Sequence, residues 1–339
     1  MLSGRGSLND APDMHSPGQR HLLAFIAIGA VLAGALLYAL WRAPEPIPLR
    51  RHPLEIHVLD VGQGDSLLII SPMGKAVLID AGPPEAADTV LAALRREKVH
   101  ELNLVVATHP HADHIGGMVD VLETFPVKLF LDSGQVHPTR TVARMLETIR
   151  ERGIAFLIAE PGQEFELEEG ITLRVLAPMK PRIVRAGRDR LNANSIVLLL
   201  TDGSFSLLLT GDSERETEKR LLRTYPSLSA NILKVAHHGS RYATSRPFLE
   251  RLRPEVAIIS CGAGNPYGHP AQETLDRLRA VVPTLYRTDL HGEITISVDR
   301  RSYWIETEYP TSADVWVGRS SGHRSVEDRA TEVPERAFR

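Results

Sequence analysis

Short apolar runs rich in Val, Ile and Leu recur between residues 54 and 310, and Gly, Pro, Asp or Asn bounds most of them. Runs of this length and composition are typical of buried β-strands. We predict strands at 54–60, 66–70, 76–80, 102–107, 127–131, 154–158, 171–176, 195–200, 206–210, 232–235, 256–260 and 293–298.

The segments between several of these runs have helical periodicity instead. In 140–152, for example, Val142, Met145, Leu146 and Ile149 recur at the spacing of one helix face. We predict helices at 85–98, 117–125, 140–152, 214–224, 246–252 and 271–281. Many strands with helices scattered between them indicate a layered α/β body whose sheets are covered by helices.

One longer apolar run precedes this body. Residues 22–41 contain no charged residue and no proline, and a helix of that length spans about 30 Å, the thickness of the hydrocarbon layer. A buried core helix is one alternative, and a cleaved signal peptide is another. The run exceeds the usual length of a signal-peptide core and lacks a small-residue cleavage site, so we predict a transmembrane anchor. Arginines on both sides leave its orientation open.

The remaining segments outside the body differ in composition from it. Residues 1–21 form a polar N-terminal segment, and 42–53 hold four prolines, which predicts a stiff linker. From 311 to 339 the chain is polar and lacks periodicity, so we predict a disordered tail. The folded domain is then 54–310.

Composition narrows the class of protein without identifying it. The 339 residues are 43% hydrophobic and 24% charged, which excludes a wholly disordered, collagen-like or polytopic membrane chain. The formal net charge of −3 gives no global signal for nucleic-acid binding. A single cysteine excludes an internal disulfide and a multi-cysteine zinc site. The 14 histidines are the more informative count, because they cluster.

The densest cluster follows the predicted strand 102–107. It comprises His109, His111, Asp113 and His114, and neutral imidazole and carboxylate are good ligands for zinc and similar divalent ions. A tight turn after a strand can direct the first two histidines at one ion and the Asp–His pair at a neighbouring ion. Glycines 116 and 117 then allow the next helix to begin close to that centre.

Two later segments fit the same centre. Gly211-Asp212 follows one apolar strand, and His237-His238 follows another. Taken alone, a Gly-Asp pair after a strand is most often an ordinary turn, and a His-His pair is more often a surface or core feature. Together with the 109–114 cluster they indicate more, because a carboxylate can bridge two cations and a further histidine can complete a site.

These motifs, in this order, resemble the metallo-β-lactamase superfamily, and more closely the ComEC-type (competence protein) hydrolase domain. The HxHxDH segment carries the superfamily resemblance, and the Asp-Val-Gly-Gln-Gly-Asp and His-His-Gly-Ser segments carry the closer one. The resemblance implies an αββα sandwich with a metal site at one edge. The matching segments are 59–66, 78–82, 108–117, 194–195, 209–212, 234–240, 265–270 and 287–289.

The resemblance also implies roles for individual residues. His109 and His111 are expected to hold one metal, and Asp113 and His114 belong to the second site. Asp113 is expected beside the attacking water, and Asp212 is expected to bridge the metals.

The last ligand and the identity of the metal stay open. His238 is the expected ligand and His237 the alternative, and the sequence does not separate them. Many members of the superfamily have a further histidine before the Gly-Asp strand, whereas this chain has Leu-Asn-Ala-Asn-Ser at 191–195. An oxygen ligand there favours harder ions such as manganese over a second zinc, so one or two zinc or manganese ions are expected.

Further residues are expected around the metals. His269 is a candidate donor to the substrate or the leaving group, and Asp80 is expected to buttress the metal loop. Other candidates for substrate-binding or supporting roles are Asn194, Ser195, Ser240 and Asn265.

A basic stretch bears on the substrate. Lys180, Arg182, Arg185, Arg188 and Arg190 precede the 191–195 segment, and such a group can hold phosphates if it lies at the mouth of the site. A solvated loop is the alternative.

We therefore expect a membrane-anchored, metal-dependent phosphodiesterase or nuclease that acts on an anionic phosphodiester, with single-stranded DNA as the candidate substrate. Its hydrolase domain is expected on the extracytoplasmic side of the cytoplasmic membrane. A metallohydrolase of lactams, lactones or thioesters is one alternative, and a non-catalytic binding domain is another.

Overall fold

The computed structural model describes residues 53–184, 189–300 and 302–310. Contacts between residues divide the chain into Met1–Leu49 and Arg50–Arg339, and the described residues all belong to the second unit. The predicted polar segment, the anchor at 22–41, the tail at 311–339 and all of the linker except Pro53 lie outside the described residues. Within the described part of the chain, no helix combines the length and the apolar character needed to cross a membrane.

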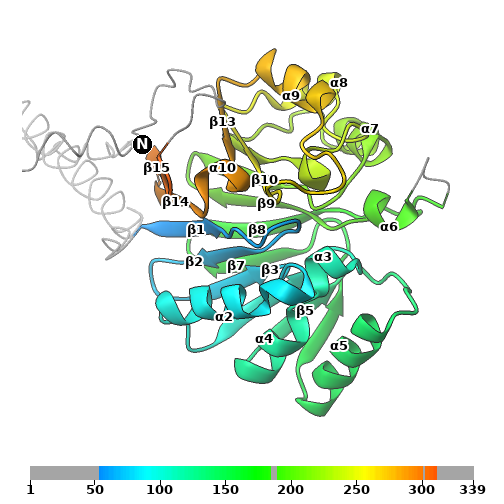
Figure 1. The fold of residues 1–339 in the computed structure, drawn as a ribbon, viewed down its shortest axis with the longest axis vertical. Helices are drawn as coiled ribbons and strands as arrows, with labels where there is room; N and C mark the ends of the chain where they lie inside the picture. Colours follow the sequence, from blue (N-terminus) through cyan, green and yellow to red (C-terminus); the bar gives the residue numbers. More distant parts are fainter. Residues whose placement is uncertain (1–52, 185–188, 301, 311–339) are drawn as a thin grey trace, which may run out of the picture. The chain divides into compact units, whose positions relative to one another are not determined.

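Two sheets form the centre of the described unit (Figure 1). The first has eight strands in the order β15-β14-β1-β2-β3-β4-β5-β6, and β3, β4, β5 and β6 run parallel. Its strands are β1 (Leu54–Val58), β2 (Leu67–Ile70), β3 (Ala76–Ile79), β4 (Leu102–Ala107), β5 (Leu129–Asp132), β6 (Ala155–Ile158), β14 (Ile294–Asp299) and β15 (Ser302–Thr307).

The second sheet has seven strands in the order β13-β12-β11-β10-β9-β8-β7, and β10, β11, β12 and β13 run parallel. Its strands are β7 (Glu164–Glu168), β8 (Ile171–Ala177), β9 (Val197–Asp202), β10 (Phe205–Leu209), β11 (Ile232–Lys234), β12 (Val256–Ile259) and β13 (Thr284–Arg287).

The central core lies between the two sheets, and the period-2 pattern of the strands explains how. Along β10, Leu207 and Leu209 belong to the core between the sheets, whereas Leu208 packs with the helices on the outer face. Successive side chains of a strand point to opposite faces. A strand covered on both faces must therefore be apolar at nearly every position, as these runs are.

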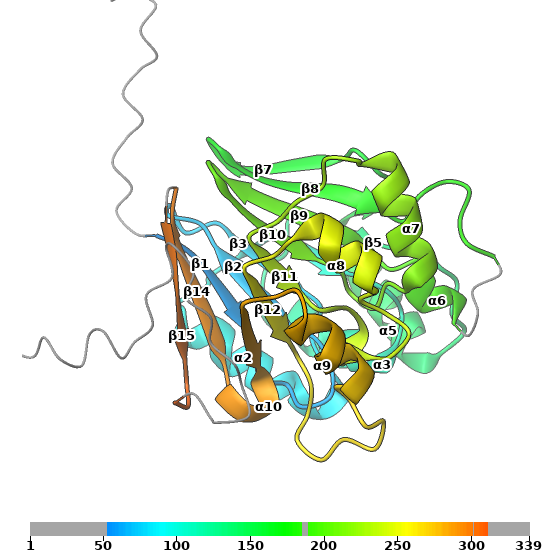
Figure 2. The ribbon, with the colours of Figure 1, turned by 90° about the horizontal axis from the view of Figure 1, so that it is seen from above.

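Helices cover the outer face of each sheet, which completes four layers (Figure 1). Helices α2 (Ala87–Arg96), α4 (Met118–Thr124) and α5 (Arg140–Glu151) pack on the eight-stranded sheet. Helices α7 (Arg215–Thr224), α8 (Arg246–Leu252) and α9 (Gln272–Arg279) lie across the seven-stranded sheet, as Figure 2 shows. The described residues therefore form the expected αββα sandwich.

Short helical turns connect several strands to these layers. They are η1 (Pro84–Ala86), α3 (Ala112–Ile115), α6 (Arg190–Ala193), η2 (Ala236–Gly239) and α10 (Thr288–His291). The carboxyl ends of β3, β4, β10, β11 and β12 lead into the loops that carry the candidate metal ligands and their supports. This is the edge at which parallel strands position a functional site.

Candidate metal centre

A cleft of about 610 Å³ lies at this edge of the fold. The side chains that line it come from loops of both sheets, so the sandwich itself brings them together. Among the residues expected from the sequence, those lining the cleft are His111, Asp113, Asp212, His237, His238, Ser240 and His269.

The loop after β4 carries the first group of side chains. His109 and His114 are fully buried, whereas about a third of the Asp113 side chain is exposed. A Cβ atom on Gly116 would overlap the backbone of Pro84, so glycine is required for the close approach of this loop to η1.

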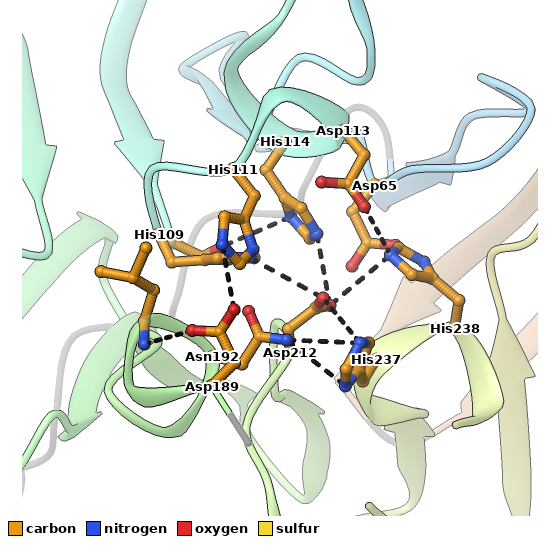
Figure 3. Close-up of polar contacts among 12 residues, drawn as sticks. Asp65, His109, His111, Asp113, His114, Asp189, Asn192, Asp212, His237 and His238 are labelled. Atoms are coloured by element: carbon orange, nitrogen blue, oxygen red, sulfur yellow. Dashed lines mark hydrogen bonds and ion pairs between the residues drawn. The ribbon is translucent and has the colours of Figure 1, made fainter. Parts of the chain in front are cut away.

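The carboxylate of Asp212 lies at the middle of the cluster (Figure 3). Its Oδ1 atom lies 3.2 Å from His114 Nε2 and 3.6 Å from His238 Nε2. Its Oδ2 atom lies 3.8 Å from His109 Nε2 and 3.7 Å from His237 Nε2. Each carboxylate oxygen therefore has its own pair of imidazoles, which is the arrangement of a bridging carboxylate between two half-sites.

Asp113 and His111 extend the two pairs of imidazoles at Asp212, one on each side. Asp113 Oδ2 lies 3.4 Å from His238 Nε2, and ligand atoms of Asp113, His114, Asp212 and His238 all lie within 4.8 Å of one another. On the other side, His111 Nδ1 lies 3.0 Å from His109 Nε2. The structure thus brings together every residue that the sequence analysis placed at the metals.

The backbone at η2 explains why both members of the His pair take part. His237 and His238 both adopt left-handed conformations, with φ of 52° and 53°. Two consecutive non-glycine residues in this region are unusual, and such strain concentrates at functional sites. The His238 side chain is buried beside Asp113, whereas His237 is one-fifth exposed and lies on the other side of Asp212.

Asp80 supports this centre from the end of β3. Its Oδ2 atom lies 2.7 Å from His114 Nδ1 and accepts a hydrogen bond from the Thr108 hydroxyl at 2.7 Å. Its Oδ1 atom accepts from the Thr108 backbone amide at 2.8 Å. A carboxylate in this position makes Nδ1 a hydrogen-bond donor to Asp80 and leaves Nε2, which faces Asp212, as the nitrogen that can bind a cation in place of a proton.

A buried ion pair supports His238 in a comparable way. His238 Nδ1 lies 3.1 Å from the Ser260 carbonyl oxygen and 3.4 Å from Asp65 Oδ1. Asp65 in turn accepts from Lys234 Nζ with both oxygens at 2.8 Å. Nε2 of His238 is therefore the nitrogen that faces the cluster.

The carboxylates create a strongly negative local field. Burial by itself would lower the pKa of His114 and His238, yet Asp212 outweighs it, with Asp80 acting on His114 and Asp65 on His238. The pKa of His114 is held well above its usual range and that of His238 is raised to about 10. Burial and the neighbouring His114 charge hold the pKa of His109 well below its usual range. The field that attracts protons here also attracts a divalent cation.

The donor set fits a metal. His114 Nε2, Asp212 Oδ1 and His238 Nε2 are buried, and within the described part of the chain none of them makes a hydrogen bond of normal geometry. Buried polar atoms without hydrogen bonds are costly unless they coordinate a cation. Imidazole and carboxylate suit zinc and manganese alike.

The remaining expected residues hold more peripheral places. Asn194 is buried and bonds to both backbone groups of Ile183, and Ser195 packs against Gly211; neither lines the cleft. Asn265 organises the loop that carries His269. His269 lies in the cleft, and burial together with the charges of His237 and His238 lowers its pKa to about 4.

Several residues at the site were not among those expected. Asn192, rather than Asn194, reaches the metal centre, with Nδ2 3.3 Å from His237 Nε2. Asp189 lines the cleft and lies 3.3 Å from His111 Nε2. Asn192 could have been predicted from its place in the 191–195 segment, where many members of the superfamily have a histidine. Asp65 and Lys234 belong to the two motifs that carry the closer resemblance.

The described members of the basic stretch do not line the cleft. Among its described members, Lys180 pairs with Glu160, Arg182 donates to the carbonyl of Ser133, and neither these two nor Arg190 lines the cleft. Arg185 and Arg188 lie outside the described residues. Arg241, from the segment after the His pair, is the arginine that lines the cleft in the described part of the chain.

Comparison with known proteins identifies the family. The chain is 31% identical over 278 residues to ComE operon protein 3 of Bacillus subtilis, covering 76% of this chain and 35% of that protein. It is also 31% identical over 274 residues to Recombination protein 2 of Haemophilus influenzae, covering 79% and 32%. Competence protein ComA of Neisseria gonorrhoeae is 29% identical over 272 residues, covering 80% and 35%.

The chain thus spans about a third of the length of these curated relatives. Residues 59–263 match the metallo-beta-lactamase superfamily. This range includes strands β2 to β12 and the ligand loops from 109 to 238, and it leaves out β1, β13, β14 and β15. The four-layer fold, the paired half-sites at Asp212 and this match together show that the chain belongs to the metallo-beta-lactamase superfamily.

Proposed function

We propose that this protein is a metal-dependent phosphodiesterase that cleaves single-stranded DNA. The observation that carries the proposal is the division of imidazoles between the two oxygens of Asp212. A carboxylate shared in this way suits a pair of cations, and paired cations suit the in-line displacement at a phosphodiester.

The donor atoms divide into two sets. His109, His111 and His237 would hold the first ion, with His237 taking the place of the histidine that is missing at 191–195. Asp113, His114 and His238 would hold the second, and Asp212 would bridge. When bound, zinc or manganese ions lower the pKa of water toward neutrality and polarise the oxygen under attack.

Asp113 is the ligand best placed to act on the attacking water. Its side chain is 34% exposed and lines the cleft, whereas His109, His114 and Asp212 are buried. Burial raises the pKa of Asp113, but His238 and His114 outweigh that effect and lower it to about 2. The carboxylate is thus ionised at neutral pH and can accept a hydrogen bond from water. His269 lines the same cleft, and because its lowered pKa keeps the imidazole neutral at pH 7, its ring N–H can donate a hydrogen bond to the leaving group.

The choice of a phosphodiester rests on two further points. Two of the relatives that match most of the chain are named a recombination protein and a competence protein, and both names refer to processes that handle DNA. Arg241, with its side chain 57% exposed, lines the same cleft as the metal ligands. Its guanidinium pairs at 3.3 Å with the exposed Glu273, and a phosphate in the cleft can compete for it. The chain covers only about a third of the length of those relatives, so we propose rather than transfer a DNA-related activity for it.

The test is a substrate panel on the full chain, loaded with Mn²⁺ or Zn²⁺ or treated with chelator. Bis-p-nitrophenyl phosphate and a single-stranded oligonucleotide report phosphodiester cleavage, and nitrocefin and a thioester report the alternative hydrolase activity. We expect metal-dependent cleavage of the phosphodiesters, reduced about 100-fold or more by Asp113→Asn. Asp120→Asn, an exposed aspartate on α4, is the matched control. Turnover of nitrocefin or the thioester alone would overturn the proposal, as would the absence of all turnover.

We further propose that residues 22–41 anchor the protein in the cytoplasmic membrane, with the hydrolase domain on the extracytoplasmic side. The support is the uncharged apolar run and the competence relatives. Alkaline phosphatase fused after residue 339 is active only when exported, so it should be active, whereas fluorescent protein fused at the same point should be dark. The opposite pair of results would place the domain in the cytoplasm.

A further inference from the structure

The exposed aromatic side chain of Tyr267 lies at the cleft. Tyr267 lines the cleft that contains the metal ligands and is 69% exposed. Among the exposed large hydrophobic side chains of the described residues, it is the one that lines this cleft. An exposed aromatic ring at the mouth of a polar site is a candidate contact for substrate.

The loop holds this tyrosine in a defined position. The Asn265 side-chain oxygen accepts from the backbone amides of Tyr267 at 3.2 Å and His269 at 3.0 Å, while its nitrogen donates to the Gly262 carbonyl at 2.9 Å. These bonds hold both ends of the turn that presents Tyr267. A ring presented on a fixed turn loses little conformational freedom when a ligand binds.

The ring of Tyr267 continues a series of rings that leads out from the metal centre. The centroids of Tyr267 and His269 lie 5.9 Å apart with 25° between the ring planes, so the two rings are stacked. The ring centroid of His269 lies 5.6 Å from that of His237 and 6.3 Å from that of His238. One face of the tyrosine is thus turned to His269, and its exposure leaves the other face for a planar ligand.

The charges of the cleft indicate which planar ligand fits. The guanidinium of Arg241 and the candidate metal ligands occupy the same cleft as Tyr267. A nucleotide combines an anionic phosphate with a planar base, so its phosphate can contact the cationic groups while its base contacts the tyrosine ring. The reacting groups of lactams, lactones and thioesters offer neither a phosphate nor a planar base. The 610 Å³ of the cleft suits a short segment rather than a duplex.

We propose that Tyr267 forms a base-stacking subsite, on which an unpaired nucleobase beside the scissile phosphodiester stacks. This inference rests on the proposed phosphodiesterase function. Because the faces of bases within a duplex are already stacked on their neighbours, the subsite selects single-stranded substrate and is tolerant of base identity.

The test compares two single-stranded substrates of equal length, oligothymidylate and an oligomer of abasic sites. Both carry the same phosphates, but only the first carries bases. We expect Tyr267→Ala to lower kcat/KM on oligothymidylate by about 10-fold, mainly through KM, and to leave the abasic oligomer unchanged. Tyr267→Trp should keep or improve the preference. Tyr309→Ala, an exposed tyrosine away from the cleft, is the matched control.

The outcomes separate this proposal from the one on which it rests. If the wild type cleaves neither oligomer, the proposed function has failed, and binding of the same fluorescent oligomers by anisotropy still tests the subsite. Equal effects of Tyr267→Ala on both oligomers, or no effect on either, would overturn the stacking subsite while leaving phosphodiesterase activity standing.

Discussion

Lys234 and Asp65 form a buried ion pair behind the candidate metal centre. The ammonium of Lys234 lies 2.8 Å from both carboxylate oxygens of Asp65, and each side chain is 2% exposed. Lys234 ends β11 of the seven-stranded sheet, while Asp65 precedes β2 of the eight-stranded sheet. The pair therefore joins the two sheets at the point where Asp65 also approaches His238 Nδ1.

Breaking this pair on one side is expected to be costly. Lys234→Met keeps most of the side-chain volume but leaves the Asp65 carboxylate buried without its partner, which typically costs about 3–5 kcal/mol. Adding Asp65→Asn removes that unpaired charge, so the double variant should recover a large part of the loss. Denaturant unfolding in the presence of chelator measures both free energies. A double variant whose loss equals the sum of the two single losses would contradict the pairing.

The same pair predicts a characteristic pH dependence. Burial favours the protonated form of Asp65, but Lys234 and then His238 outweigh burial and hold the pKa of Asp65 well below its usual range. A lowered folded-state pKa contributes stability that is present above the unfolded value and is lost as the pH falls through the folded value.

We therefore expect the difference in unfolding free energy between wild type and the Asp65→Asn/Lys234→Met double variant to stay constant from about pH 5 to 6. Above about pH 6.5 the difference should fall, because Asp65 helps to raise the pKa of His238 and the double variant lacks that carboxylate. On the acid side it should change only below about pH 4, where the unfolded carboxyl begins to bind protons. Asp276→Asn, an exposed position on α9, controls for general acid effects. A shift of the difference between pH 6 and 5 would show that Asp65 titrates at an ordinary or raised pKa.

The two half-sites at Asp212 predict how metal content responds to substitution. His237→Ala and His238→Ala each remove an imidazole from a different oxygen of Asp212, so each should lower bound metal from about two ions to about one. Asp212→Ala removes the shared ligand and should abolish both. Elemental analysis after dialysis against Mn²⁺ or Zn²⁺ gives the stoichiometry, with exposed His100→Ala as the control. Retention of full metal by His237→Ala would restrict that residue to a supporting role.

The hydrogen bonds of Asp80 predict an effect on metal affinity. Asp80→Asn weakens the contacts to His114 and Thr108 and no longer favours the His114 tautomer with a free Nε2 lone pair. Removal of such a support typically costs 10–100-fold in metal affinity. Competition with a chromogenic chelator measures the affinity. Thr108→Ser, which keeps the hydroxyl, should stay near wild type. Unchanged affinity in Asp80→Asn would show that the carboxylate acts on folding alone.

Several elements could be predicted because their signals are local. Strand β4 at Leu102–Ala107 and helix α8 at Arg246–Leu252 have the predicted bounds. Strand β7 was missed because its sequence, Glu-Phe-Glu-Leu-Glu, alternates charge with apolar residues at the sheet edge. Strands β13 and β15 were also missed. One is a short run of four residues, and the other is an edge strand whose apolar residues are mixed with polar ones.

The layered α/β class and the cluster at 109–114 follow from neighbouring residues, whereas the resemblance to the superfamily implied the four-layer sandwich. A strand pattern depends on adjacent side chains, and four candidate ligands within one turn need no distant partner to be recognised. Adjacent residues alone do not show which of two neighbouring histidines faces a site, so the sequence left His237 and His238 as alternatives. Their left-handed backbone turns them to opposite sides of Asp212, and a backbone conformation of that kind is imposed by the surrounding packing.

The long-range pairings required the folded chain. Lys234 meets Asp65 across 169 positions, Asn192 replaces Asn194 at the centre, and the acidic Asp189 lies in the cleft where basic residues were expected. Local periodicity carries no information on which loops converge at one edge of two sheets. That convergence depends on the order of the strands and on the packing of the sheets, and it decides which polar side chains meet.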